Sequence, residues 1–120
     1  MGEVLDLDVL RPKPSKIKLA GKEIDVSYMP CGITFEVDKI VRALAEVVAT
    51  GKATDNGEET HRAFDLSIDL CVVFCSWKHP ELDREWFMDN TDPRQVEALA
   101  SKIQETLQRS YAGAEAYQKN

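Results

Sequence analysis

Three residues in the second half of the sequence have the types and the spacing of a metal site. Cys71, Cys75 and His79 are four positions apart, so one continuous helix would place all three on nearly the same side. Thiolate and imidazole groups are ligands that zinc prefers, but structural zinc sites use four of them. Both cysteines also lie in an apolar stretch, where free cysteines pack as ordinary core. Core packing is therefore the favoured interpretation, no metal site is assigned, and a metal-binding regulator remains an alternative.

Other reactive residues lack the partners that catalysis needs. Cys31 would need a nearby base to act as a nucleophile, and neither His61 nor His79 has a recognisable catalytic context. Asp65 and Asp69, four positions apart, are typical of a solvated helix face. The sequence also contains no nucleotide-binding glycine pattern and no metalloprotease motif. We therefore expect a protein that is not an enzyme and has no cofactor.

The aromatic residues indicate a different kind of site. Trp86, Phe87 and Met88 are adjacent in a short predicted helix, and three adjacent side chains on a helix cannot all face one core. Aromatic residues and methionine are enriched at protein interfaces. Tyr111 lies near the end of the last predicted helix and is a further candidate contact. These four residues form the predicted protein-binding set.

Composition limits the partners of the chain. Its 120 residues correspond to one domain, and 15 basic against 21 acidic residues give a net charge of −6. That charge disfavours binding to nucleic acid or to an anionic membrane. No apolar run approaches the ~18 residues of a membrane span. Acidic Glu3 and Asp6 stand where a signal peptide needs a basic start, so we expect a cytoplasmic protein.

The first third of the chain predicts an arm followed by a β-hairpin. Prolines at positions 12 and 14 make residues 1–15 a flexible N-terminal arm. Alternating apolar residues then predict two strands over residues 16–28 with a turn at residues 20–22. Because an isolated two-stranded ribbon is marginally stable, its apolar face must be covered by helices.

Three main helices and one short helix follow in the sequence pattern. The first is expected over 34–49 with Thr34 as its cap, and the short one over 83–89. The second, over 58–78, is apolar around nearly its whole circumference, although a strand over 70–74 is an alternative.

The last helix, over 92–111, has the clearest start signal in the sequence. Asp92 is the predicted cap, Pro93 the first helical residue, and Gln95 completes a variant capping box. Residues 112–120 form a predicted frayed tail. The expected fold is α+β and mainly α, with the hairpin packed on the helices of a single globular domain over residues 16–111.

Several segments together resemble a known family. Residues 6–14 (DLDVLRPKP) and 17–24 (IKLAGKEI), followed by an acidic and apolar helix, resemble the short tail assembly chaperones of long-tailed, siphovirus-like bacteriophages and prophages. Residues 85–90 (EWFMDN) and 92–99 (DPRQVEAL) are similar to the tryptophan, turn and helix pattern in the C-terminal part of that family. The likeness covers most of residues 5–110 and rests on the order and texture of these segments.

The resemblance implies a function that the residues alone do not. It implies a non-enzymatic chaperone in the cytoplasm of the bacterial host, which binds the tape measure protein and helps recruit major tail tube protein subunits. Such a protein is absent from the mature virion, and self-association into a homo-oligomer is open to it. The first alternative is a small phage structural adaptor, such as a tail completion or neck component.

Overall fold

The computed structural model describes residues 4–51 and 58–118. Along these residues the elements are a short 3₁₀ helix η1 (Leu7–Leu10), strands β1 (Lys16–Leu19) and β2 (Lys22–Asp25), and helices α1 (Cys31–Gly51), α2 (Glu58–Ser76), α3 (Arg84–Asn90) and α4 (Pro93–Gln118). The two strands form an antiparallel hairpin. This mainly helical α+β fold, with three long helices and one short helix in the described part, confirms the predicted fold class.

The hairpin forms where apolar and charged residues alternate. Ile17 pairs with Ile24 across the two strands, which places two β-branched side chains beside each other. The loop has two residues, Ala20 and Gly21, with φ of 49° and 83°. Two positive φ angles are the geometry of a type I′ turn, whose twist matches that of the flanking strands. The predicted hairpin and its turn are therefore confirmed.

Strand β2 is shorter than the alternation predicts. It ends at Asp25, whereas the apolar pattern continues to Tyr28. The Asp25 carboxylate accepts hydrogen bonds from the backbone N–H of Ser27 at 2.9 Å and from its hydroxyl at 2.6 Å. Such a local side-chain contact turns the backbone away from a strand.

Helix α1 begins three residues before its predicted cap. It starts at Cys31, and the carbonyl of Pro30 accepts hydrogen bonds from the Thr34 N–H at 2.8 Å and the Thr34 hydroxyl at 3.0 Å. Thr34 is therefore already inside the first turn, and its assignment as the cap is wrong. The Thr34 hydroxyl donates its hydrogen bond to a carbonyl four residues earlier, as threonine hydroxyls do within helices.

Helix α2 is the central helix, as its apolar circumference predicts. Leu70, Cys71 and Phe74 are fully buried, and the segment 70–74 is helical rather than extended. The helix ends at Ser76, shortly before the predicted end at 78. Contacts with α1, α3 and α4 on different sides explain why so many of its side chains are apolar.

The caps of α3 and α4 follow the local sequence signals. Asp83 accepts a hydrogen bond from the Trp86 N–H at 2.9 Å. Asp92 accepts from the Gln95 N–H at 3.0 Å, while the Gln95 side chain accepts from the Asp92 N–H at 2.9 Å. The second pair is a reciprocal capping box, so the predicted start of α4 is confirmed.

The end of α4 lies beyond its predicted position. The helix continues to Gln118, whereas the apolar pattern predicts an end near residue 111. Residues 119 and 120 of the predicted tail lie outside the described residues, and fraying of residues 112–120 stays a prediction.

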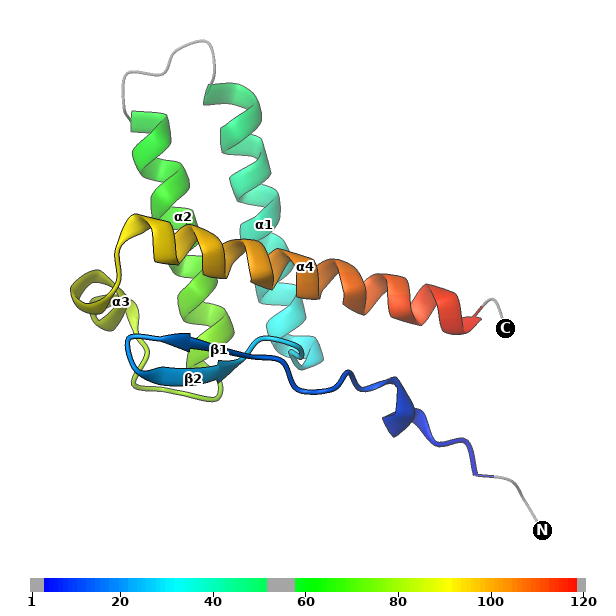
Figure 1. The fold of residues 1–120 in the computed structure, drawn as a ribbon. Helices are drawn as coiled ribbons and strands as arrows, with labels where there is room; N and C mark the ends of the chain where they lie inside the picture. Colours follow the sequence, from blue (N-terminus) through cyan, green and yellow to red (C-terminus); the bar gives the residue numbers. More distant parts are fainter. Residues whose placement is uncertain (1–3, 52–57, 119–120) are drawn as a thin grey trace.

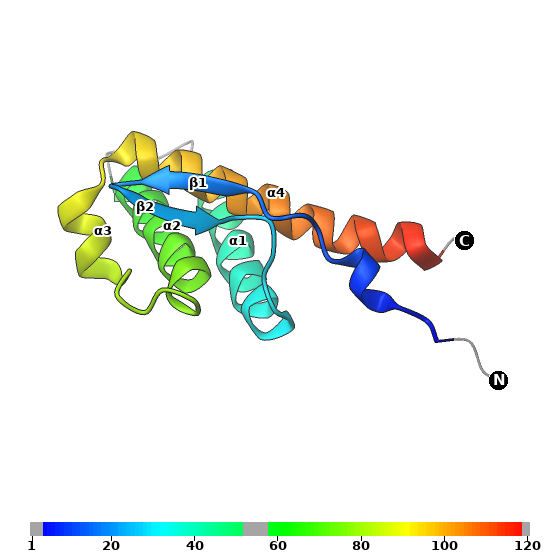
Figure 2. The same cartoon turned by 60° about the horizontal axis from the view of Figure 1, so that its bottom comes forward.

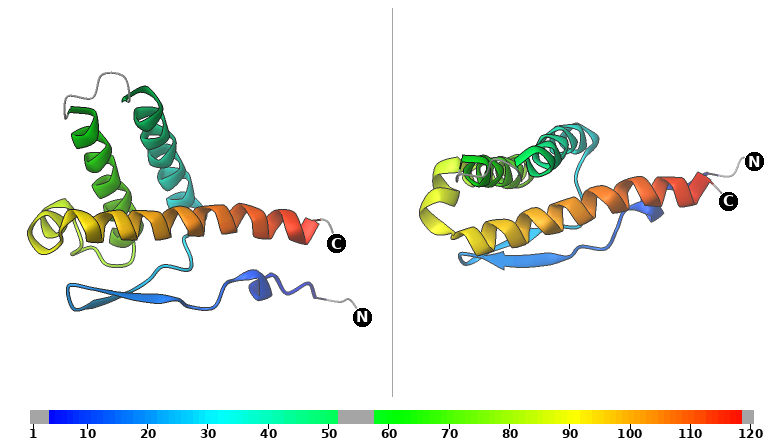
Figure 3. Two further views of the ribbon diagram at one scale, coloured as in Figure 1. Left: turned by 45° about the horizontal axis from the view of Figure 1, so that its top comes forward. Right: turned by 90° about the horizontal axis from the view of Figure 1, so that it is seen from above.

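The elements form an elongated molecule with extents of 66 × 35 × 19 Å. Helices α1 and α2 lie side by side, and α4 crosses both of them steeply (Figure 1). The hairpin runs alongside α4 (Figure 2). From the hairpin, residues 4–15 continue toward the C-terminal end of α4, so the two ends of the described part lie on the same side of the molecule (Figure 3).

Candidate protein-docking site

The cysteines and histidine of the metal alternative are not arranged as ligands. Cys71 and Cys75 are buried, and the Cys71 thiol donates a hydrogen bond to the Val96 carbonyl at 3.6 Å. Burial raises the pKa of Cys71, and it raises the pKa of Cys75 to about 12, so both stay protonated at neutral pH. His79 lies beyond α2, with its imidazole 3.9 Å from the Glu81 carboxylate. Among the described residues, no three histidine, cysteine or acidic side chains gather as a metal site.

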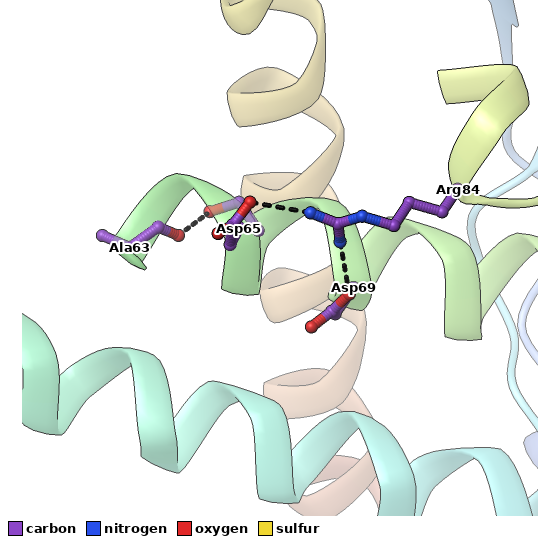
Figure 4. Close-up of polar contacts among 5 residues, drawn as sticks. Ala63, Asp65, Asp69 and Arg84 are labelled. Atoms are coloured by element: carbon purple, nitrogen blue, oxygen red, sulfur yellow. Dashed lines mark hydrogen bonds and ion pairs between the residues drawn. The ribbon is translucent and has the colours of Figure 1, made fainter. Parts of the chain in front are cut away.

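The acidic pair on α2 has a partner that the sequence spacing does not reveal. Arg84 extends from α3 to α2, and its guanidinium donates to Asp65 and to Asp69, each at 2.7 Å (Figure 4). All three side chains are about half exposed. The cluster joins two helices, and the arginine balances part of the acidic charge on α2.

The predicted protein-binding set does not form one surface. Phe87 is buried, so its assignment to a binding surface is wrong, and its ring meets that of half-buried Trp86 edge-on at 5.0 Å. Met88 and Tyr111 are exposed. Met88 lies on α3, whereas Tyr111 lies on the part of α4 that extends away from α3 (Figure 1). These two exposed residues therefore belong to separate faces.

An open groove lies between α4 and residues 4–15, which are called the arm below. Its volume is about 490 Å³. The walls come from three segments that are distant in sequence: the arm, the residues that follow β2, and the later turns of α4. The residues that shape it include Leu7, Leu10, Tyr28, Met29, Thr106 and Arg109. Tyr111 follows the last groove residue on α4, Ser110, so one predicted contact residue lies next to the groove.

Hydrogen bonds hold the groove walls together. The Val26 N–H donates to the Ser15 carbonyl at 2.8 Å, and the buried Thr106 hydroxyl donates to the Val26 carbonyl. The Asp25 carboxylate accepts from the N–H groups of Ser15 and Ser27 at 3.3 and 2.9 Å. Partial burial raises the pKa of Asp25, but the hydrogen bonds from Ser27 and Ser15 outweigh it and hold that pKa below its usual value.

The base of the arm is fixed by an aromatic contact. The guanidinium of Arg11 stacks over the ring of Tyr28, 3.9 Å from the ring centroid. This is the geometry of a cation–π interaction. Pro12 and Pro14 follow and restrict the backbone between the stacked arginine and the hairpin. The arm is therefore held in place at its junction with the fold.

The charge around the groove is opposite in sign to that of the whole chain. Arg11, Lys13 and Arg109 line it together with a single acidic residue, Asp8. Arg109 also pairs with Glu105 at 3.3 Å. The chain carries a net charge of −6, whereas the groove lining has three basic residues and one acidic residue. This lining suits an apolar segment that carries carboxylates.

The arm carries five exposed valine and leucine side chains, two of which line the groove. Leu7 and Leu10 are three residues apart in η1 and both line the groove, as the 3₁₀ spacing allows. Val4, Leu5 and Val9 do not line it, and they are 91%, 67% and 72% exposed. Apolar exposure concentrated in one short segment is typical of an interaction site.

From its prolines, the sequence predicts a flexible arm over residues 1–15 and assigns no binding residue to it. The available signal was the alternation of Leu5 and Leu7 with Asp6 and Asp8, an apolar pattern with no partner strand nearby.

In the described part of the chain, no helix combines the length and the apolar character that crossing a bilayer requires.

Known proteins provide no direct identification. Comparisons of the chain with protein-family models, curated proteins and solved structures gave no match. The groove, the arm and the sequence resemblance are therefore the basis for a functional proposal.

Proposed function

We propose that this protein is a tail assembly chaperone of long-tailed bacteriophages or prophages. It acts in the bacterial host cytoplasm without catalysis, binds the tape measure protein, helps recruit major tail tube protein subunits, and is absent from the mature virion. The sequence resemblance supports the identity of these partners. The observation that carries the docking role is the open groove bordered by the exposed apolar arm.

The shape and chemistry of the groove suit reversible binding to a protein segment. Leu7 and Leu10 supply exposed apolar surface, and Arg11 and Arg109 add positive charge to the lining. A chaperone must release its client, so each contact has to be weak. Many weak contacts along one long client add up to firm binding through their high effective concentration.

Co-purification tests the proposal directly. The tagged protein is co-expressed with the tape measure and major tail tube proteins encoded near its gene, and we expect it to retain the tape measure protein. Tyr111→Ser, beside the groove, should lower the retained amount several-fold. Phe35→Ser on α1, where the side chain is also well exposed, is the matched control. If neither partner is retained by folded, soluble protein, the proposal fails.

Purified virions distinguish the chaperone from a structural adaptor. A chaperone leaves the particle, so mass spectrometry of virions should not find this protein. Its presence at a fixed copy number would favour the tail completion or neck component instead.

A further inference from the structure

We propose that the groove between the arm and α4 binds an acidic amphipathic helix, whose apolar face is bordered by carboxylates. The inference rests on the proposed function in taking the groove as the client-binding site, and it adds the chemistry of the client segment that enters. Such a segment has apolar residues three and four positions apart with glutamate or aspartate beside them.

The first argument is the shape of two of the groove walls. Leu7 and Leu10 lie three positions apart in η1, where the 3₁₀ geometry places them on the same side. Thr106, Arg109 and Ser110 are spaced by three and four positions along one face of α4. Both walls are therefore helical, and a third helix packs its side-chain ridges between theirs. A groove of about 490 Å³ has the size of a small-ligand pocket, so it takes side chains from a few turns of that helix.

The second argument is the uncovered apolar surface on the arm wall. Leu7 and Leu10 line the groove and are still 56% and 48% exposed, and no residue of η1 is buried. Burying these two side chains against a bound segment removes apolar area from water, which favours binding. Pro12 and the partly buried Tyr28 extend the lining toward the hairpin.

The third argument is charge. Arg11, Lys13 and Arg109 line the groove. Of these three cations only Arg109 pairs with a carboxylate within the described part of the chain, that of Glu105 at 3.3 Å. The Arg11 guanidinium lies over the Tyr28 ring, a contact that takes none of its N–H donors. A carboxylate that enters the groove therefore gains partners that the fold itself does not supply.

The same charges act against other segments. A basic helix with an identical apolar face brings like charges together at Lys13 and Arg11, and an uncharged helix leaves both without a carboxylate. The contact is small and its ion pairs are exposed, so binding is weak and sensitive to salt. Weak binding of each acidic segment suits a chaperone that has to release its client.

Two synthetic helical peptides test the charge requirement on the purified full-length protein. The acidic peptide has leucines at helical spacing flanked by glutamates, and the basic peptide has lysine in place of every glutamate. Fluorescence anisotropy of the labelled peptides measures binding at low and high salt. The net charge of −6 would by itself favour the basic peptide, so a preference for the acidic peptide indicates binding at the basic groove.

We expect the acidic peptide to bind at least about ten-fold more tightly than the basic peptide at low salt. The difference should shrink at high salt, because the exposed charges are screened.

Variants of the groove locate the binding site. Lys13→Glu and Leu7→Ser change exposed lining residues that lie outside the core. Lys39→Glu on α1 is the matched charge control, and Val48→Ser, at 55% exposure against 56% for Leu7, is the matched apolar control. Each groove variant should bind the acidic peptide at least about five-fold more weakly, and Lys13→Glu should also bind the basic peptide more tightly. Both controls should bind like the wild type, and circular dichroism verifies that each variant is folded.

Two results would overturn the inference: a basic peptide that binds as tightly as the acidic one, or groove variants that bind the acidic peptide like the wild type. Binding of dodecanoate in preference to the acidic peptide would overturn it as well, and would assign the groove to small amphiphilic anions. In each case, retention of the tape measure protein leaves the chaperone proposal standing. A groove that selects the acidic peptide in a protein that does not retain the tape measure protein removes the chaperone proposal alone.

Discussion

The buried hydroxyl of Thr106 on α4 donates a hydrogen bond to the backbone carbonyl of Val26, 80 positions earlier in the chain. The same oxygen lies 3.1 Å from the Lys102 carbonyl, which is its alternative acceptor within the helix. The first contact ties the residues after β2 to α4, and both segments are walls of the groove. One hydroxyl therefore connects the hairpin to the helix at the candidate docking site.

Replacing this hydroxyl should destabilise the fold. Thr106→Val keeps the shape of the side chain but removes the donor, leaving a buried carbonyl short of a partner. We expect a loss of about 1–2 kcal/mol in the free energy of unfolding, measured by urea denaturation. Ser110→Ala, which removes a hydroxyl bonded only within α4, is the control and should change stability by less than about 0.5 kcal/mol.

The bridge from Arg84 to Asp65 and Asp69 should contribute modestly and in a salt-dependent way. Arg84→Met removes both ion pairs and leaves two carboxylates four positions apart on α2. Because all three side chains are about half exposed, we expect a loss of about 1 kcal/mol that shrinks at high ionic strength. Urea denaturation at low and high salt measures it.

The comparison variant for this bridge is Arg94→Met. Its guanidinium is 91% exposed and pairs with Asp92 only two positions away, so its removal should have little effect. An Arg84→Met variant as stable as Arg94→Met at low salt would show that the bridge does not hold α3 to α2.

Local signals explain the parts of the fold that the sequence predicts. The turn at Ala20 and Gly21 and the capping box of Asp92 and Gln95 each depend on residues within three positions of one another. A local signal can also mislead, as it does at Thr34. The Thr34 hydroxyl bonds to the Pro30 carbonyl within the first turn and does not cap the helix.

The candidate site and the bridge from Arg84 to α2 both depend on contacts that no local pattern encodes. Arg84 meets Asp65 across 19 positions, and the groove joins the arm to α4 from opposite ends of the sequence. Phe87 and Met88 are neighbours in one short helix, yet one is buried and the other exposed. Which of them faces the core depends on how α3 is rotated against α2. A run of adjacent apolar residues in the sequence does not specify that rotation.

The hairpin turn offers a stabilising substitution. Ala20 has a φ of 49°, a left-handed conformation that strains residues with a Cβ but suits asparagine and glycine. Ala20→Asn should raise the free energy of unfolding by up to about 1 kcal/mol. Urea denaturation measures the change, and Lys18→Asn, on the exposed face of β1, controls for adding asparagine outside the turn. Equal or lower stability of Ala20→Asn would contradict this account.

The hydrogen bonds to Asp25 should make the free energy of unfolding depend on pH in the acid range. Because the folded protein holds the pKa of Asp25 below its usual value, the folded state favours the ionised carboxylate. The stability that the ionised Asp25 carboxylate contributes is fully present above its unfolded pKa of about 3.9. This stability is lost as the pH falls through the lower pKa of the folded protein.

The measurement compares the wild type with Asp25→Asn by urea denaturation between pH 7 and acid conditions. The stability difference should be constant near neutrality and shrink below about pH 4. Glu97→Gln, at an exposed position on α4, controls for the loss of one negative charge. A difference that stays unchanged through the acid range would contradict the assignment.

The three cysteines should differ sharply in reactivity. Cys31 is exposed, whereas Cys71 and Cys75 are buried, and burial raises the pKa of Cys75 to about 12. Because the thiolate is the reactive form, a chromogenic disulfide reagent should titrate one thiol in the native protein and all three after denaturation. Cys31→Ser should abolish the native reaction. Rapid native reaction of Cys71 or Cys75, together with stoichiometric metal in protein purified without chelator, would revive the metal-binding alternative, because thiolates are what a metal would require.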